Sequence, residues 1–386
     1  MRRGAHRALS AGPEAAALGG WKKGRKPNMK PTLRRTLAAA LGAACLLSLS
    51  ACGGNGGESS SPSGQTTSPG GTESSSPQTQ APAANETNPL TGVADITPGA
   101  STRPVALMVE NSATARPQLG LDKADLFLEA ETEGGITRIM AVFAGASRVP
   151  DKIGPIRSAR SPFVTVAQSL DAVYGHAGGS TLGLANIQNF GLDDMNFLSN
   201  AAQAGWRDAD LQAQRGSEHS LLTSGQNLQN FISSQGYEAA TSHPAPFGFT
   251  APQAGNGPGS KVQLSFSGLQ RVCFVYDAGT GLYAKYNGTL DSMEPHVMVD
   301  GSQIAVTNVI IMYDEKYNED ADHINFRLSA GDGVFLTAGT SRDIRWTRTA
   351  ESLSFTEQDG TPLSVNPGKT YICLVTQGNR VATVLQ

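Results

Sequence analysis

Apolar residues in the first half of the folded sequence come in short runs, as expected for buried strands. Residues 105–109 follow Pro104, and residues 124–130 and 136–143 form two further runs. Runs of this length without a helical period are typical of strands that are covered on both faces. We therefore predict three strands in this region.

A helical period follows these strands. Ser161 is predicted as the N-cap and Pro162 as the first helical residue, a position that tolerates proline. The next apolar residues have i, i+3, i+4 and i+7 spacing, which predicts a helix over residues 162–171 with one buried face. These apolar residues are Phe163, Val166, Ala167 and Leu170. A short strand over residues 172–175 should come next.

Capping signals predict a second helix further along the chain. Thr223 and Gln226 have the spacing of a capping box, and Gly236 is a typical helix stop. Its apolar face would consist of Leu228, Phe231 and Ile232. The first half of the folded sequence therefore alternates strands and helices.

The pattern changes after residues 240–260, which are rich in Pro, Gly, Ala and Ser. Beyond them, short runs of β-forming residues are separated by turn signals such as Asn287-Gly288. The runs lie at 262–266, 271–276, 283–286, 306–313, 323–328, 334–337, 344–348 and 371–376. The predicted fold class is an α/β (or α+β) N-terminal domain over residues 89–250, followed by a mostly β C-terminal domain over residues 260–386.

Residues 1–51 are predicted to be a signal peptide, with Met29 as the true start. Three cations, Lys30, Arg34 and Arg35, precede an apolar stretch that is too short for a permanent membrane span. The stretch ends in Leu49-Ser50-Ala51-Cys52, which resembles a bacterial lipobox; the alternative is an ordinary signal with a chance cysteine. We expect Cys52 to carry lipid and the protein to be anchored on the extracytoplasmic face of the cell membrane.

Residues 52–88 are predicted to be a disordered, lipid-anchored linker. From residue 53 to residue 88 there is no Val, Ile, Leu, Met or aromatic residue, and 19 of the 36 positions are Gly, Ser or Pro. Removal of residues 1–51 takes away ten of the 30 Lys and Arg and one of the 33 Asp and Glu, which leaves a net charge near −12. This charge argues against nucleic acid as a partner, because the summed field would repel it.

Two cysteines remain in the folded part, Cys273 and Cys373, and each lies inside an apolar run. We interpret them as buried thiols in strands, with a single disulfide between them as the alternative that the compartment permits. The sequence has no H-E-x-x-H, no C-x-x-C and no regular Asp loop for calcium. We predict no metal site and no cofactor.

The strongest candidate for chemistry is residues 153–160, directly before the first predicted helix. The helix N-terminus favours an anion, and Arg157 and Arg160 could supply forked donors to a phosphate or carboxylate. Arg138 is expected to join them, and Arg116 and Arg207 could do so if the fold brings them close. The alternative is that these arginines pair with an acidic run in the same domain. That run consists of Asp122, Asp125, Glu129, Glu131 and Glu133.

Residues 174–180 form a second candidate, because they follow a predicted strand. His176 could act as a general acid or base, and Gly178 and Gly179 could present backbone donors. No G-x-S-x-G nucleophile elbow occurs, and the stretch lacks the lysine of a phosphate-binding P-loop. Two further histidines, His219 and His323, are interpreted as surface or structural residues.

Five segments resemble one family closely: residues 103–111, 115–118, 133–138, 153–160 and 176–180. They are similar to the YerB-type lipoproteins, which carry a paired N- and C-terminal domain of unknown function (the DUF3048 type). The resemblance covers about residues 89–386 and implies a lipoprotein with two domains, but it brings no catalytic residue. The family often has Pro-His-Asn where this chain has Glu218-His219-Ser220, so only His219 matches there.

These patterns predict an envelope protein that binds an anionic cell-envelope ligand or a protein partner without turning it over. The expected ligand-binding residues are Arg138, Arg157, Arg160, His176, Gly178 and Gly179. The first alternative is a cell-wall-acting enzyme that uses the same arginines, with His176 as acid or base. The second is a purely structural or assembly role, for which no small anion would bind.

Overall fold

The computed structural model describes residues 84–386, which belong to one compact unit. The predicted signal peptide, the lipidation site at Cys52 and most of the predicted linker lie outside the described residues. Three residues at the end of that linker belong to the fold. Glu86–Thr87 forms strand β1, and the buried Asn88 donates a hydrogen bond to the carboxylate of Asp125 at 3.1 Å.

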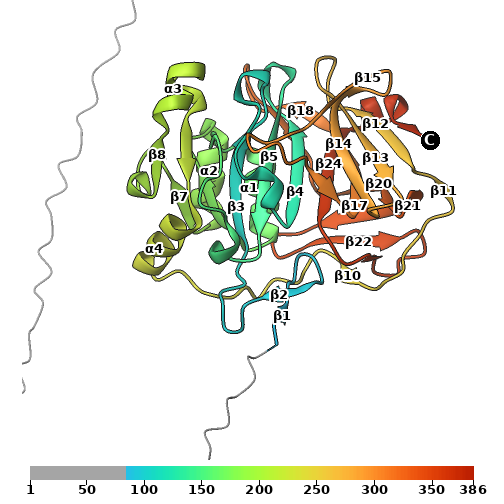
Figure 1. The fold of residues 1–386 in the computed structure, drawn as a ribbon, viewed down its shortest axis with the longest axis horizontal. Coiled ribbons are helices and arrows are strands. Elements are labelled where there is room, and N and C mark those ends of the chain that lie inside the picture. Colours follow the sequence, from blue (N-terminus) through green and yellow to red (C-terminus); the bar gives the residue numbers. More distant parts are fainter. Residues whose placement is uncertain (1–83) are drawn as a thin grey trace, which may run out of the picture. The chain divides into compact units, whose positions relative to one another are not determined.

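A large mixed sheet runs through the middle of the unit (Figure 1). Its ten-strand path has the order β11-β21-β20-β17-β24-β4-β5-β3-β6-β7, and β22 also pairs with β21. Along this path the strands are Gly257–Pro258, Thr340–Arg348, Ala330–Thr337, Asn308–Asp314, Thr370–Thr376, Leu126–Glu131, Thr137–Phe143, Val105–Glu110, Val173–His176 and Asp194–Asn196; β22 is Leu353–Glu357. The parallel trio β17, β24 and β4 joins the two halves of the chain, so the predicted boundary at residues 240–260 separates two segments within one compact unit.

A second, antiparallel sheet comes from the C-terminal half and has the order β15-β14-β13-β12-β25, with β16 also on β14. Its strands are Ser292–Pro295, Leu282–Thr289, Arg271–Asp277, Lys261–Ser265, Val384–Leu385 and Ala305–Val306. The shorter pairs elsewhere are β1 with β2 (Ala94–Ile96), β8 (Gly205–Arg207) with β9 (Leu221–Thr223), β10 (Gly248–Phe249) with β23 (Ser364–Val365), and β18 (Lys316–Asn318) with β19 (Ile324–Phe326). The predicted fold class is confirmed: a mixed sheet with helices first, then mostly antiparallel strands.

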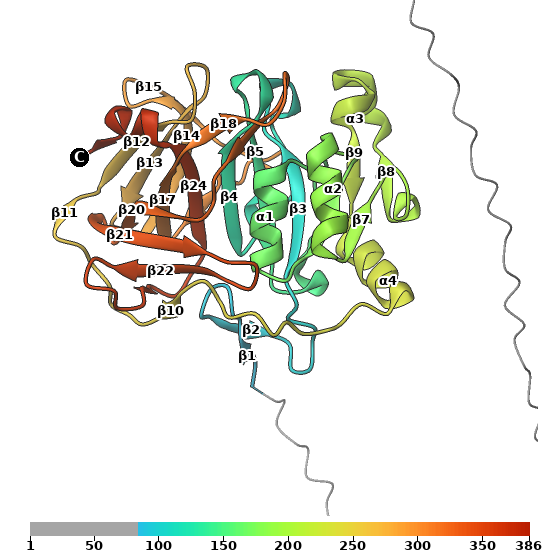
Figure 2. The ribbon, with the colours of Figure 1, turned by 180° about the vertical axis from the view of Figure 1, so that it is seen from behind.

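Two hydrophobic cores lie on the two faces of the large sheet, because successive residues of a strand point to opposite sides. In β3, Leu107 packs in the core that includes β12, β13 and helix α4 (Gly225–Gln235). Its neighbour Met108 packs in the other core, with helices α1 (Ser161–Ser169) and α2 (Thr181–Phe190). Figure 2 shows α1 in front of β3 and β4, with α2 beside it towards β7. Because the strands are covered on both faces, their sequences read as continuous apolar runs.

Both predicted helices exist, but each N-cap lies one residue from its predicted position. The N-cap of α1 is Arg160 rather than Ser161, because Ser161 already has helical backbone geometry and its hydroxyl bonds elsewhere. The N-cap of α4 is Ser224 rather than Thr223, and its hydroxyl accepts the backbone N–H of Asn227. Gly236 ends α4 with φ +69°, as its sequence position predicts.

Two helices had no prediction, α2 and the short α3 (Ala209–Arg215). Helix α2 fully buries only Gly183 and Ile187, and its Leu184 and Phe190 are only partly buried against the core, so its apolar face is narrow. Its ends nevertheless carry ordinary signals. Ser180 caps the N-terminus through its hydroxyl, and Gly191 ends the helix with φ +65°.

Both cysteines of the described residues are free and buried, which agrees with the interpretation as core thiols rather than a disulfide. Cys273 lies in β13 and Cys373 in β24. Burial raises the pKa of the Cys273 thiol to about 11 and that of Cys373 well above its usual value. Neither thiol is therefore a ready nucleophile.

A buried ion pair ties the two halves together beneath the sheet. The carboxylate of Glu129 (β4) lies 3.4 Å from the ammonium of Lys285 (β14), and neither side chain is exposed. The same carboxylate accepts the hydroxyl of Tyr371 at 2.7 Å. Lys285 donates to Nδ1 of His296 at 2.9 Å, and burial together with Lys285 lowers the pKa of His296 well below its usual value. The network thus joins the two halves through a pair of fully buried opposite charges.

Candidate functional site

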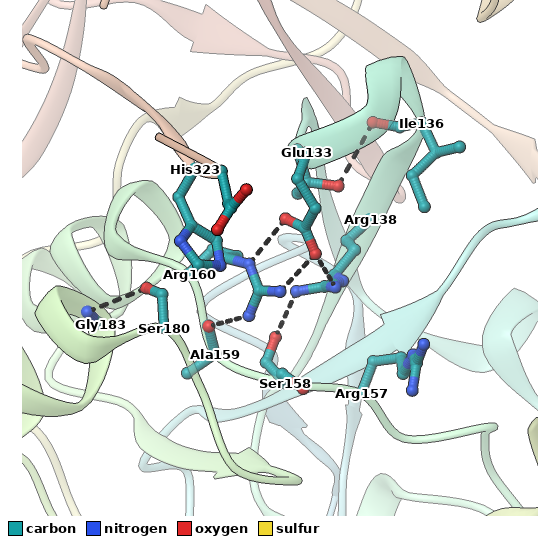
Figure 3. A network of polar contacts seen from close by, with 12 residues as sticks. Glu133, Ile136, Arg138, Arg157, Ser158, Ala159, Arg160, Ser180, Gly183 and His323 are labelled. Atoms are coloured by element: carbon teal, nitrogen blue, oxygen red, sulfur yellow. Dashed lines mark hydrogen bonds and ion pairs between the residues drawn. The ribbon is translucent and has the colours of Figure 1, made fainter. Parts of the chain in front are cut away.

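Arg138 and Arg160 converge on one carboxylate, that of Glu133 (Figure 3). Arg138 donates to Glu133 Oε1 at 2.7 Å, and Arg160 donates through Nε to Oε2 at 2.7 Å and through a second nitrogen to Oε1. Both guanidiniums also donate to backbone carbonyls, those of Ser158 and Ala159. The two arginines are 3% and 8% exposed. We call Glu133, Arg138 and Arg160 the closed cluster.

The charge balance of the closed cluster explains its pKa shifts. Burial alone would raise the pKa of Glu133, but the hydrogen bond from Arg160 and the charges of both arginines hold it at about 2. Burial and the neighbouring Arg160 lower the pKa of Arg138 to about 10. Arg138 and Arg160 are therefore counter-charges for the acidic run, as the alternative interpretation of the sequence predicts. The carboxylate that a ligand would bring to these two arginines is already supplied by Glu133 of the chain itself.

A second carboxylate of the chain lies at the N-terminus of α1, where an external anion was predicted, and also at the N-terminus of α2. Glu319 follows strand β18 and accepts the hydroxyl of Ser161, the first residue of α1, at 2.5 Å. It also accepts the hydroxyl of Ser180, the N-cap of α2, at 3.2 Å. Negative charge at these positions complements both helix dipoles. The C-terminal half thus fills the anion position that the sequence of the N-terminal half creates.

His176 is fully buried at the end of β6, and both of its ring nitrogens are engaged. Nδ1 donates to the carbonyl of Gly178 at 2.7 Å, and Nε2 lies 3.0 Å from a carboxylate oxygen of Asp194, within hydrogen-bond distance. Because a carbonyl can only accept, Nδ1 carries the proton of the first hydrogen bond. No ring nitrogen is left to exchange a proton with a substrate in this arrangement.

Gly178 and Gly179 also serve the local fold. The N–H of Gly178 donates to the side-chain oxygen of Asn196 at 3.0 Å, and Gly178 has φ +65°, which favours glycine. At Gly179, a Cβ would lie 3.0 Å from the Leu184 side chain and 3.1 Å from that of Ala159. The turn lets the chain pass close to α2. The contacts of the two glycines therefore serve the local packing around His176.

Arg157 lies apart from the closed cluster and belongs to a different group (Figure 3). Its Nε is 3.5 Å from Glu110 Oε2, the same oxygen that accepts Nδ1 of His219 at 2.9 Å. Its Nη2 donates to Glu218 at 3.1 Å. Glu110 is 3% exposed, whereas the Glu218 side chain is 74% exposed. We call Glu110, Arg157, Glu218 and His219 the open cluster.

A cavity of about 210 Å³ lies beside the open cluster. Arg157, Glu218 and the exposed Arg207 all line it, together with Ser158. Arg207 donates through one nitrogen to the carbonyl of Ser217 and has no carboxylate partner among residues 84–386. Two guanidiniums thus share one cavity, which can hold a phosphate or carboxylate by forked hydrogen bonds.

Glu110 and His219 form the arrangement of a carboxylate-oriented histidine. The buried carboxylate of Glu110 fixes Nδ1 as the bonded nitrogen, and within the described residues Nε2 of His219 makes no hydrogen bond. The His219 side chain is 20% exposed, so this nitrogen can reach solvent or a ligand. A histidine in this state is a better acid or base than the enclosed His176.

No local pattern could predict the pairing of Glu110 with His219, because 109 positions separate them. Glu110 lies in one of the segments that carry the family resemblance, whereas His219 lies outside them and matches the family only as a single residue. Arg207, a possible addition to the predicted arginines, lines the same cavity as Arg157. Arg116 lies in another cavity.

No group of three or more metal-ligating side chains occurs in residues 84–386. In the same part of the chain, no helix has the length and apolar character that a membrane span requires.

Comparison with known proteins decides the family. Residues 90–238 match the profile of the protein of unknown function DUF3048, N-terminal domain, and residues 262–372 match that of its C-terminal domain. The chain belongs to the DUF3048 family. The two profiles together cover most of the described residues. They leave out residues 239–261, where the sequence becomes rich in Pro, Gly, Ala and Ser.

A curated relative of this DUF3048 protein is named "Putative lipoprotein YerB", from Bacillus subtilis. It is 29% identical over 293 residues, which cover 74% of this chain and 85% of the relative. The crystal structure of YerB from Bacillus subtilis matches with a TM-score of 0.67 at 26% identity, and the match covers 77% of this chain and 98% of that one. The predicted resemblance to YerB-type lipoproteins is therefore confirmed.

Proposed function

We propose that this DUF3048 protein is a lipid-anchored extracytoplasmic protein that binds an anionic envelope ligand in the cavity of Arg157 and Arg207. The lipobox-like sequence at Cys52 and the lipoprotein name of the curated relative support the anchor. The observation that carries the binding site is the contrast between Arg157 and the other predicted arginines. Arg157 keeps an exposed edge beside a second arginine, whereas Arg138 and Arg160 are enclosed around Glu133.

Glu218 is the group that an incoming anion would displace. Its pairing with Arg157 is solvent-exposed, and exposed ion pairs contribute at most about 1 kcal/mol. A phosphate or carboxylate held by two guanidiniums gains stronger, charge-assisted hydrogen bonds. The buried Glu110 would stay in place and hold Arg157 in position from behind.

A thermal-shift titration of the unlipidated chain (residues 53–386) with phosphate, pyrophosphate and citrate tests the proposal. A ligand that binds only the folded state raises its unfolding free energy, by about 2.7 kcal/mol at a concentration 100 times Kd. We expect a higher Tm that is lost in Arg157→Gln and Arg207→Gln. The matched control is Arg271→Gln, which removes an exposed arginine of β13. No shift with any anion, or an equal shift in all variants, would refute the proposal.

A second candidate function is that of an enzyme that acts on a phosphate or carboxylate group in the cell wall. The hydrogen bond between Glu110 and His219 favours it. His219 replaces His176 as the acid or base in this version, because only His219 has an unengaged ring nitrogen among the two. Turnover of a chromogenic phosphate monoester by the wild type, lost in His219→Asn with unchanged phosphate affinity, would establish it. Binding without turnover leaves the first proposal.

A further inference from the structure

A separate cavity of about 260 Å³ lies where the N-terminal half meets strands β14 and β15. Arg116 comes from the loop that follows the short 3-10 helix Ala113–Ala115. Asn287 and Glu294 face it from β14 and β15, where they are register partners. The side chains of Pro117, Pro295 and Val297 form an apolar part of the cavity wall.

Two of the residues that line the cavity each have a buried polar atom without a partner in the described part of the chain. Nη1 of Arg116 and Oδ1 of Asn287 are both buried and have no hydrogen-bond partner among residues 84–386. Buried polar atoms without partners are uncommon, because desolvation is then uncompensated. Burial also lowers the pKa of Arg116, although Glu129 and Glu294 oppose the shift. Two such atoms around one cavity point to a ligand that satisfies both.

The charges around the cavity select the class of that ligand. An anion would satisfy Arg116 but would face the carboxylate of Glu294 and could not donate to Asn287. A cation would satisfy Asn287 but would face Arg116. A neutral secondary amide satisfies both, because its carbonyl accepts from Arg116 and its N–H donates to Asn287. Its flanking methyl or Cα would contact the apolar wall.

His296 contributes surface but no chemistry to this cavity. Its Nδ1 accepts from Lys285, and its Nε2 donates to the side chain of Gln118 at 3.0 Å, so neither nitrogen is available. His296 therefore does not exchange a proton with a ligand in this cavity.

We propose that the Arg116 cavity is a binding site for a secondary amide group, carried by either an acetamido sugar or a peptide unit. The proposal does not depend on the anion site at Arg157, since different residues line the two cavities. The Arg116 cavity would then be a second binding site, which recognises a neutral amide rather than an anion.

Titration of the unlipidated wild-type chain with N-acetylglucosamine and with N-acetylalanine methylamide, followed by NMR, tests this site. We expect saturable shifts, and contacts between the ligand's acetyl methyl and Val297, for at least one probe. Binding of the sugar alone or of the peptide alone supports the site and identifies the source of the amide. Binding of both shows that the amide itself is recognised.

Variants then test the two polar contacts. Arg116→Met and Asn287→Ala should each weaken amide binding at least fivefold, while Arg271→Gln should leave it unchanged. Glucosamine and acetate, which lack the amide, should not produce the Val297 contact. Absence of binding by both amides to the wild type would overturn the proposal without any variant. Equal binding of acetate or glucosamine at Val297 would also overturn it.

Discussion

The closed and open clusters use the same residue types for opposite purposes. In the closed cluster two buried arginines share the carboxylate of Glu133, and each also donates to a backbone carbonyl. In the open cluster one arginine is held from behind by the buried Glu110 and meets only the exposed Glu218 in front. The clusters therefore differ in the burial of their arginines: Arg138 and Arg160 are almost fully buried, whereas the side chain of Arg157 is 26% exposed and can reach the proposed ligand.

The largest expected effect is on the closed cluster. Glu133→Gln would leave Arg138 and Arg160 buried without a carboxylate, and removal of one partner of a buried ion pair costs about 3–5 kcal/mol. Urea unfolding of the variant measures the loss. The matched change in the open cluster, Glu218→Gln, should alter the unfolding free energy by less than about 1 kcal/mol. Equal losses would remove the distinction between the clusters.

The pH dependence of stability sharpens the same distinction. The pKa of Glu133 is lowered to about 2, so its stabilisation is present above the unfolded pKa of about 4.3 and is lost as the pH falls towards about 2. The stability difference between wild type and Glu133→Gln should therefore be constant above about pH 5 and shrink below it. A difference that stays constant down to pH 2 would contradict the pairing.

Substitution of His176 should mainly lower stability, whereas substitution of His219 should mainly affect the chemistry performed on a ligand. His176→Asn would disrupt two buried hydrogen bonds and cost about 1–3 kcal/mol, with little effect on anion binding by the folded fraction. His219→Asn should change stability by less than about 1 kcal/mol, leave phosphate affinity unchanged and abolish any turnover of the phosphate monoester. Chemical unfolding, binding titrations and a turnover assay would measure these effects. The reverse pattern would return His176 to the site.

The smallest expected effect is a gain in affinity for pyrophosphate. Glu218→Gln removes the carboxylate that competes for Arg157, so pyrophosphate affinity should rise up to about fivefold, which corresponds to about 1 kcal/mol. Calorimetric titration against the wild type measures this change. Weaker binding would mean that Glu218 helps to build the site.

Sequence patterns predicted the fold class, most strands and two helices, because burial on both faces leaves apolar runs that are easy to detect. They missed α2, whose apolar face is narrow, although Ser180 and Gly191 marked its ends. They also predicted ligand binding at Arg138, Arg160 and His176 together with Arg157. Three long-range contacts favour Arg157 alone among these: Arg160 with Glu133, Ser161 with Glu319, and Glu110 with His219. Local spacing carries no information on such pairs, since topology creates them.

The anion site of the open cluster is tested by isothermal titration of pyrophosphate into the unlipidated wild type, Arg157→Gln and Arg271→Gln. We expect saturable binding to the wild type and to Arg271→Gln. Binding to Arg157→Gln should be at least tenfold weaker, because a charge-assisted hydrogen bond contributes about 1.5–3 kcal/mol. Binding that is unchanged in Arg157→Gln, or absent from the wild type, would contradict an anion site in the open cluster.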